Sequence, residues 1–535
     1  MGSSRREFLK SSATAAGAAA SIAASPTMAT ASQAAAAATP QAGSKKPNIV
    51  IIMTDQQRAD HSAREGFALD TTPHLDRMAR EGVWFNRAYT SMPACVPART
   101  SMFTGRWPEA NRARTNHNTQ DVVYNTDLID VLKEQGYVTG LCGKNHCYMT
   151  PQRFDHWLQM GHGGGMPKND AERKFDTFLK DMHHGVALEP TPFPLEVQCP
   201  HRAVSSATEW IDTLEEQPFF LWLTFPEPHN PFQAPEPYYS MFPPDAVPPR
   251  RSTAAHLKQK GFKYEFARSL VERGFSNWEA QLERQPSVYC GMLRMIDDQV
   301  KRFTGFLDDR GLSDNTIVIN LADHGDFVGE YGLVRKGPEL PEVLTRIPLS
   351  FTGPGIVATP EPHDAHVSIV DVMPTICDAL DVPIPEGVQG RSLWPMLTGQ
   401  DYPKEEFNSI YAEHGFGGLY WTDEEEITAT EEGALNDVIG FDELNQWSQC
   451  GQQRMVRKGD WKLLFDMQGN GQLYNLVEDP VELYNLYFDP QYRDIKQELH
   501  EELMAWSLRA QDSIPAPRRR YSVKTDPHNY WSPHR

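Results

Sequence analysis

Polar and ionisable side chains gather at four places in this sequence of 535 residues, each directly after a short apolar run. The four sets are Asp55-Gln56, Lys144 with His146, His229 inside a Pro-His-Asn-Pro run, and Asp323-His324. Carboxylates, amides, imidazoles and ammonium groups bind ions and move protons. A single Asp at a strand end is usually a turn former, and a single His is usually a satisfied surface or core residue. The coincidence of four sets favours a metal-assisted site for an anion.

Two of these sets supply candidate ligands for one cation, namely Asp55 with Gln56 and Asp323 with His324. Oxygens of Asp and Gln suit a hard ion such as Ca²⁺ or Mg²⁺. The nitrogen of His324 also allows Mn²⁺, Fe²⁺ or Zn²⁺. The seven cysteines are few and odd in number, so they imply no disulfide framework.

A cysteine segment carries a further signal, because Cys95-Val96-Pro97-Ala98-Arg99 is followed by Thr104-Gly105. Pro97 suits the first turn of a helix and Gly105 suits its end. Cys95 then lies at the helix N-terminus, where free N–H groups favour an anion. Arg99, one turn later, can reach back to the same place. The alternative, a buried structural Cys beside a surface Arg, is disfavoured by this combination of residues.

The apolar runs before the four polar sets are predicted to be buried strands, at 48–54, 137–142, 219–225 and 316–322. Helical patterns lie between them, at 128–135, 203–216 and 289–310. This alternation predicts an α/β fold with a largely parallel sheet covered by helices on both faces. In such a sheet the carboxyl ends of the strands form the ligand-binding edge, so the four polar sets are expected to meet there.

The sequence predicts four consecutive parts, of which this α/β region is the second. Residues 1–44 contain Arg5-Arg6 before an Ala-rich stretch and resemble a bacterial twin-arginine export signal with its linker. Residues 45–403 are the predicted catalytic domain, and residues 404–513 a smaller domain with short strands at 454–465 and 472–476 and a helix at 494–509. Residues 514–535 are predicted to be an extended tail. The signal predicts export to the periplasm or the exterior of a bacterium.

The overall charge limits the classes of partner. The chain has 51 Lys and Arg against 71 Asp and Glu, a formal net charge of −20. This charge argues against binding to nucleic acid or to anionic lipid. A polyanionic substrate therefore needs a local basic pocket. A mean hydropathy of −0.53 and the lack of an apolar run of about 18 residues argue against a membrane span in the mature chain.

The cysteine segment resembles the type I sulfatases, whose maturation motif is C-x-P-S/A-R with a downstream T-G. Other segments agree with this resemblance over about residues 45–490. Asp55-Gln56 resembles the first metal pair, Lys144 and His146 the G-K-x-H motif, His229 the P-H-x-P motif, Asp323-His324-Gly325 the D-N/H-G motif, and Lys336 the sulfate-binding lysine. The resemblance implies an alkaline-phosphatase-like α/β domain followed by a smaller α+β domain with an antiparallel sheet.

The resemblance also implies a mechanism of sulfate ester hydrolysis. In the family, Cys95 is oxidised to formylglycine (3-oxoalanine), whose hydrate offers one hydroxyl to attack sulfur and a second to expel sulfate. The expected metal is Ca²⁺, with Mn²⁺ or another divalent ion as the alternative. The implied roles are metal binding by Asp55, Gln56, Asp323 and His324, stabilisation of the hydrate by Arg99, charge neutralisation by Lys144 and Lys336, acid catalysis by His229, base catalysis by His146 and substrate contact by Asn116.

Two positions depart from the commonest family pattern. Gln56 stands where many members have Asp, and Ala98 where many have Ser. Asp followed by Gln also occurs in relatives that cleave choline sulfate or phosphonate monoesters and phosphodiesters. Hydrolysis of phosphonate monoesters or phosphodiesters is the first alternative. The second alternative is an exported protein that binds sulfated glycans and keeps Cys95 unmodified.

The implied partners follow from the same motifs. They are the formylglycine-generating machinery, the twin-arginine translocase and a small or oligosaccharide sulfate ester. We expect a sulfated carbohydrate because export places the enzyme where polysaccharide fragments arrive. The aromatic and acidic segment at 414–447 is a candidate for selecting the leaving group, and a solvated acidic loop is the alternative.

Overall fold

The computed structural model describes residues 45–274, 277–337, 339–417, 451–513 and 526–531. The predicted export signal at 1–44 lies outside these residues. The same holds for most of the predicted tail and of the aromatic and acidic segment at 414–447. These three interpretations stay predictions.

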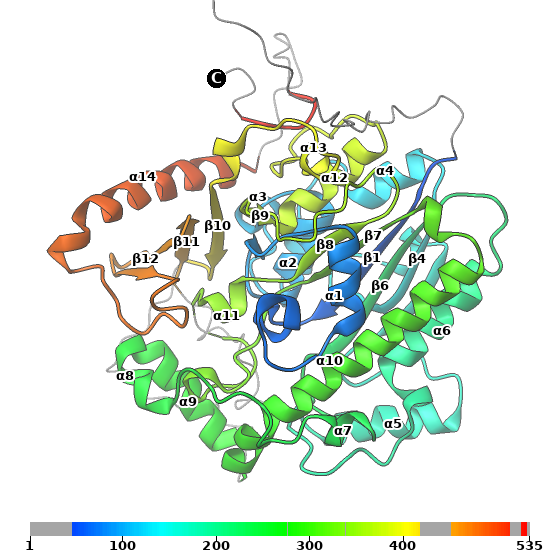
Figure 1. The fold of residues 1–535 in the computed structure, drawn as a ribbon, viewed down its shortest axis with the longest axis horizontal. Helices are drawn as coiled ribbons and strands as arrows, with labels where there is room; N and C mark the ends of the chain where they lie inside the picture. Colours follow the sequence, from blue (N-terminus) through cyan, green and yellow to red (C-terminus); the bar gives the residue numbers. More distant parts are fainter. Residues whose placement is uncertain (1–44, 275–276, 338, 418–450, 514–525, 532–535) are drawn as a thin grey trace, which may run out of the picture. The chain divides into compact units, whose positions relative to one another are not determined.

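A central sheet of seven strands organises the chain (Figure 1). Its strands are β1 (Asn48–Asp55), β2 (Val83–Trp84), β4 (Val138–Lys144), β5 (His156–Met160), β6 (Phe219–Pro228), β7 (Thr316–Ala322) and β8 (Leu349–Thr352). They lie in the order β2-β8-β7-β1-β6-β4-β5. The five strands from β7 to β5 are parallel, whereas β8 is antiparallel to β7 and β2 to β8. The predicted fold class, a mostly parallel sheet between helices, is confirmed.

Strand β1 explains why both faces of the sheet are covered. All eight of its residues are buried, and successive side chains of a strand point to opposite faces. Ile49, Ile51 and Met53 belong to one hydrophobic cluster, and Val50 and Ile52 to another. A strand with two apolar faces is stable only between two layers of helices.

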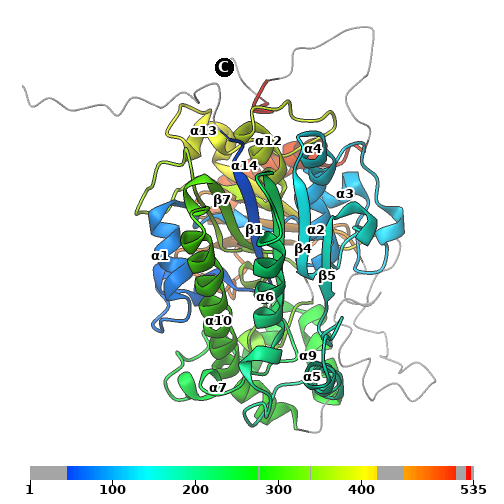
Figure 2. The same ribbon diagram turned by 90° about the vertical axis from the view of Figure 1, so that its right-hand side faces the viewer.

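Helices α2 (Cys95–Thr104), α4 (Leu128–Glu134) and α12 (Val372–Ala379) contribute side chains to the first cluster. Helices α6 (Cys199–Ile211) and α10 (Trp278–Asp309) contribute to the second, and Figure 2 shows both lying across one face of the sheet. The other helices are α1 (Pro73–Glu81), α3 (Pro108–Asn111), α5 (Asp170–Asp181), α7 (Tyr238–Met241), α8 (Leu257–Lys260), α9 (Phe262–Gly274), α11 (Glu342–Thr345), α13 (Trp394–Leu397) and α14 (Arg493–Ala510).

The predicted elements occur with shifted ends. The strand at 316–322 has the predicted bounds, and α2 ends at Gly105, which has the left-handed conformation expected of a helix cap. Helix α6 begins before the predicted 203, with Pro200 in its first turn. Helix α10 begins well before the predicted 289 and continues through Pro286, a residue that usually ends a helix.

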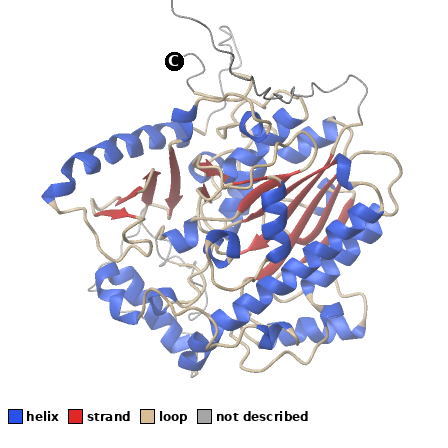
Figure 3. Cartoon of the chain, in the orientation of Figure 1, coloured by secondary structure: helices blue, strands red, loops and turns tan. Residues whose placement is uncertain are grey.

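A second, antiparallel sheet follows in the chain and is visible beside α14 in Figure 3. Its strands are β10 (Ser409–His414), β11 (Gln453–Lys458), β12 (Trp461–Asp466) and β13 (Gly471–Asn475). Leu499, Leu503 and Trp506 of α14 are buried in the same cluster as the strands of this sheet. The implied C-terminal antiparallel sheet is therefore confirmed, while the boundary near residue 403 stays a prediction. A further pair, β3 (Ala88–Tyr89) and β9 (Val367–Ser368), is parallel.

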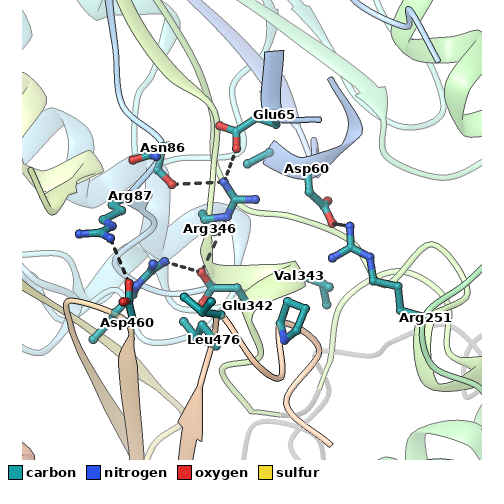
Figure 4. Close-up of a pocket in the computed structure, with 14 residues that line it drawn as sticks. Asp60, Glu65, Asn86, Arg87, Arg251, Glu342, Val343, Arg346, Asp460 and Leu476 are labelled. Carbon is teal, nitrogen blue, oxygen red and sulfur yellow. Dashed lines mark hydrogen bonds and ion pairs between the residues drawn. The ribbon is translucent and has the colours of Figure 1, made fainter. Parts of the chain in front are cut away.

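Buried ion pairs join the two sheets. Glu342 of α11 accepts hydrogen bonds from Arg457 of β11 at 3.0 Å and from Lys462 of β12 at 3.1 Å. A pocket of about 270 Å³ opens beside these pairs (Figure 4). Arg346 faces Glu65 there at 2.7 Å, and Arg87 faces Asp460 at 3.1 Å. Since its arginines are paired with carboxylates, this pocket lacks the excess positive charge that an anion needs.

Within the described residues, no helix is both long enough and apolar enough to cross a bilayer.

Candidate active site

Four neighbouring parallel strands deliver the predicted residues to one edge of the central sheet. Asp55 is the last residue of β1 and Lys144 the last of β4, while His229 directly follows β6 and Asp323 directly follows β7. Because β4, β6, β1 and β7 are adjacent in the sheet, these side chains converge. The structure thus brings the four polar sets together, as the strand-end argument predicts.

Cys95 lies at the centre of this group. It begins α2 and is fully buried. Its Sγ is 3.4 Å from Nε2 of His324, 3.6 Å from Nζ of Lys144 and 3.7 Å from Oδ1 of Asp55. Burial alone would raise the pKa of the Cys95 thiol, but the positive charges of Lys144 and Lys336 hold that pKa well below its ordinary value. The site is therefore prepared for a negatively charged atom at this position.

Arg99 connects the two acidic strand ends from one turn further along α2. Its Nη2 donates to Asp55 at 2.9 Å and its Nε to Asp323 at 2.9 Å. Its Nη1 donates to the backbone oxygen of Lys144 at 2.7 Å. A planar guanidinium with several fixed donors suits this task. Arg99 therefore fixes the carboxylates around Cys95 rather than facing solvent.

The two carboxylates and His324 form a candidate metal centre with Cys95. The four ligand atoms of Asp55, Cys95, Asp323 and His324 lie within 4.8 Å of one another. Nδ1 of His324 faces the backbone oxygen of Gly325 at 2.9 Å, so it carries the proton and leaves the lone pair on Nε2. This is the tautomer that a metal requires of Nε2.

The pKa shifts of the two carboxyl groups differ in direction. Burial would raise the pKa of Asp55, but Lys144 and Arg99 hold it well below its ordinary value. Burial and the charge of Asp55 raise the pKa of Asp323. A cation between the two groups would stabilise both in the charged form, so this donor set fits a divalent ion.

Gln56, Lys336 and His229 form a chain beside this centre. Nζ of Lys336 donates to Oε1 of Gln56 at 2.5 Å and contacts Nε2 of His229 at 3.1 Å. Nε2 of Gln56 donates to Asp326 at 2.5 Å, which directs the amide oxygen of Gln56 toward Lys336. Nδ1 of His229 donates to the backbone oxygen of Asn230 at 2.6 Å, so its Nε2 accepts from Lys336 when the ring is neutral. Burial and nearby His162 hold the pKa of His229 well below its ordinary value.

The two remaining predicted residues, His146 and Asn116, contact Cys95 and its neighbour Val96. His146 is hydrogen-bonded to Cys95, and burial together with Lys144 lowers the pKa of His146. Asn116 accepts a hydrogen bond from the backbone N–H of Val96 at 3.0 Å. It therefore caps the first turn of α2 through its oxygen and retains its amide N–H₂ for another partner.

Two further histidines belong to the site and were missed from the sequence. His162 follows β5, and its Nε2 is 2.7 Å from Nζ of Lys144. The ring of His184 lies with its centroid 6.0 Å from that of His162 and 6.3 Å from that of His229. His162 satisfies the same strand-end rule as the other sets, but the short, half-buried strand β5 carries little apolar pattern. For His184 no such signal exists.

Comparisons with known proteins agree with this geometry. The sulfatase family model matches residues 47–382. An arylsulfatase of Clostridium perfringens is 27% identical over 480 residues, which cover 84% of this chain and 92% of the relative. A Δ4,5-hexuronate-2-O-sulfatase of Bacteroides thetaiotaomicron is 26% identical over 503 residues, which cover 90% and 92%.

Among solved structures, the phosphonate monoester hydrolase of Agrobacterium radiobacter has a TM-score of 0.70 at 22% identity, covering 88% of this chain and 96% of that one. This likeness concerns the fold. The sulfatase family model, in contrast, matches more than half of the sequence. The two sulfatases named above align with this chain over 92% of their own length. The chain therefore belongs to the sulfatase family and is an enzyme of the hydrolase class.

Proposed function

We propose that this enzyme hydrolyses sulfate esters with a formylglycine made from Cys95 and a divalent metal. The observation that carries the proposal is the position of Cys95, buried at the start of α2 within 3.4–3.7 Å of His324, Lys144 and Asp55. Sγ stands in for the oxygens that formylglycine would carry there. As a hydrate, that group supplies a nucleophilic hydroxyl and a second hydroxyl that permits release of sulfate.

The metal would be held by Asp55, Gln56, Asp323 and His324. Three oxygens and one imidazole nitrogen favour Ca²⁺, with Mn²⁺ as the alternative. Such a cation lowers the pKa of a hydroxyl next to it and polarises a sulfate oxygen. Gln56 makes this site one negative charge poorer than a site with Asp at the same position.

Lysines and histidines of the chain would handle charge and protons. Lys144 and Lys336 face the space around Cys95 and would neutralise the charge that develops on the sulfate oxygens. His229 would protonate the leaving oxygen, with Lys336 next to its Nε2 at 3.1 Å. Negative charge on a bound ester raises the pKa of this imidazole and so favours the acid form.

Arg99 and His146 would act on either side of the nucleophile. Arg99 holds both carboxylates at 2.9 Å and would stabilise the hydrate. His146 would take the proton of the second hydroxyl, a role for which its lowered pKa keeps the ring neutral. Asn116 would contact the substrate through its amide N–H₂.

For the substrate we propose a sulfated carbohydrate, cleaved outside the cytoplasm after export by the twin-arginine pathway. Support comes from the hexuronate sulfatase among the relatives and from the predicted signal at 1–44. The formylglycine-generating machinery and the translocase would then be the partners during maturation.

Hydrolysis of phosphonate monoesters or phosphodiesters is the second candidate. Gln56 favours it, because Asp followed by Gln also occurs in relatives that cleave these esters, which carry the same single negative charge as a sulfate ester. Steady-state kinetics with an aryl sulfate and an aryl phosphonate monoester separate the two. A larger kcat/KM for the phosphonate ester would replace sulfatase activity as the main function.

The first experiment is a mass spectrum of the peptide across Cys95, from protein made in a host that matures a control sulfatase. The proposal expects the aldehyde of formylglycine. An unmodified thiol there, together with full activity, would refute the nucleophile.

The matching variant is Cys95→Ala. Because it removes the nucleophile, we expect turnover to fall by at least about a thousandfold with circular dichroism unchanged. Retained turnover would contradict the mechanism.

A further inference from the structure

The loop that carries His162 is built to hold one side chain in place. The backbones of Gly161 and Gly164 exchange two hydrogen bonds, at 2.8 and 3.0 Å, with His162 at the tip. Gly164 has a left-handed conformation, and a Cβ there would lie 1.9 Å from Oδ1 of Asp176. Only glycine fits this position.

A buried ion pair clamps the same loop from α5 and α6. Asp176 accepts from the backbone N–H of Gly165 at 3.0 Å. Arg202 donates to Asp176 at 2.7 Å and to the backbone oxygen of Gly165 at 2.6 Å. Helices α5 and α6, which lie outside the site, therefore fix the position and orientation of the loop.

At the tip, the ring of His162 lies between two proposed catalytic residues. Its Nε2 is 2.7 Å from Nζ of Lys144. Its face stacks on the ring of His229, with centroids 3.5 Å apart and an interplanar angle of 17°. The ammonium of Lys144 is thus held between Asp55 and His162, and His229 between His162 and Lys336.

The hydrogen bonds determine the tautomer of His162. A lysine ammonium only donates, so Nε2 accepts and the proton lies on Nδ1. Within the described residues, this buried Nδ1 has no hydrogen-bond partner. A histidine retained only for the fold usually satisfies both nitrogens. The two contacts of His162 are instead with the site residues Lys144 and His229.

We propose that His162 is a positioning residue that holds Lys144 and His229 in the orientation they need for ester cleavage. The proposal rests on the roles of these two residues in the proposed function. This proposal assigns a role to the loop at residues 161–165, which is not part of the family motifs described above.

Other titratable groups also face the ring of His162. Burial and Lys144 hold the pKa of His162 well below its ordinary value, which keeps the ring neutral as an acceptor. The groups that face His162 or its stacked partner are Asp55, Lys144, His146, His184, His229 and Lys336.

The test compares His162→Phe with His162→Gln in the matured enzyme. Phe keeps a flat ring on His229 but offers Lys144 no acceptor, whereas Gln keeps an acceptor and removes the stack. We expect Phe to bind inorganic sulfate about tenfold more weakly by calorimetry, because Lys144 loses one anchor. Gln should restore sulfate binding but lower kcat about a hundredfold, because His229 loses its orientation.

The difference between the two variants distinguishes positioning from a general loss of structure. Positioning predicts that the sulfate affinity lost in His162→Phe returns in His162→Gln, whereas kcat stays low in His162→Gln. A merely structural role would lower sulfate affinity and kcat in both variants. His156→Phe is the matched control, because His156 is at the start of β5, the strand that precedes the loop, and stacks on Trp210 of α6.

Sulfate affinity and kcat within about twofold of wild type in His162→Phe would overturn the proposal. The proposed function fails separately. If the wild type cleaves neither ester class but its sulfate affinity still depends on His162, the positioning role stands and the assigned reaction does not.

Discussion

At the scale of single residues, the surroundings of Cys95 are more positive than the molecule as a whole. The three buried cations of Arg99, Lys144 and Lys336 balance the buried carboxylates of Asp55, Asp323 and Asp326. The chain as a whole carries a formal charge of −20. The proposed divalent metal would add further positive charge. The basic pocket that an anionic substrate requires is therefore built from side chains next to Cys95, not from a basic surface.

His229 gives a prediction about leaving groups. If it protonates the departing oxygen, His229→Ala should cost little with an aryl sulfate whose phenol is strongly acidic. With an ester of an alcohol, kcat should fall about a hundred- to ten-thousandfold. The measurement is kcat for a series of esters with increasing leaving-group pKa. Equal losses across the series would exclude the acid role.

Glu227, the residue two before His229, gives a prediction about stability. Burial raises the pKa of its carboxyl to about 7, and within the described residues its Oε2 has no hydrogen-bond partner. The folded state then binds more protons than the unfolded state between pH 4.5 and 7, so wild-type stability falls as pH rises through this window. Glu227→Gln removes this loss. The free energy of unfolding of the variant, minus that of wild type, should therefore be larger at pH 8 than at pH 4.5 by up to about 3 kcal/mol.

Urea unfolding at the two pH values measures the effect of Glu227→Gln. Glu209→Gln, at an exposed ion pair with Lys168, is the control and should show no such change. A difference between wild type and Glu227→Gln that does not vary with pH would contradict the raised pKa.

At the scale of elements, the parallel sheet explains how much the sequence predicts. Asp55, Lys144, His229 and Asp323 were predicted to meet because each follows a buried strand, and adjacent parallel strands share an edge. His162 was missed because β5 is short and half-buried, so its apolar pattern is weak. Its loop depends on Asp176 and Arg202 from other elements, and contacts of this kind have no local pattern.

Helix α2 gives a prediction about Asn116. The N-cap residue of α2, Ala94, supplies no side-chain acceptor. Asn116 instead accepts a hydrogen bond from the backbone N–H of Val96 at 3.0 Å. Asn116→Ala should therefore destabilise the fold by about 1 kcal/mol, whereas Asn116→Asp, which keeps the acceptor, should not. Urea unfolding and KM are measured together. A raised KM with unchanged stability would show that substrate contact, and not capping, is the role of this side chain.

At the scale of the whole molecule, buried charges connect the central sheet to the C-terminal sheet. Burial would raise the pKa of Glu342, but Lys462 and Arg457 lower it to about 2. A lowered folded-state pKa contributes stability above pH 4.5 that is lost as pH falls toward 2. Glu342→Gln leaves two buried cations with a weaker partner and should destabilise the protein by about 3 kcal/mol at pH 7.

Amide hydrogen exchange in β11 and β12 measures the consequence of Glu342→Gln. Faster exchange is expected there at pH 7, and the difference from wild type should shrink as pH falls from 4.5 toward 2. Glu81→Gln, at an exposed pair with Arg77, serves as the control. Unchanged exchange in both strands would show that apolar packing alone joins the sheets.

The full burial of Cys95 also has a consequence in time. Asp323 and His324 lie about 230 residues after Cys95 in the chain. At roughly 5–20 residues per second, a ribosome needs about 10 to 50 seconds to reach them. Until then β7 does not exist, and the thiol cannot be enclosed. The proposed conversion of Cys95 to formylglycine would thus have to precede completion of the fold, because a chain that folded first would keep this sulfur buried.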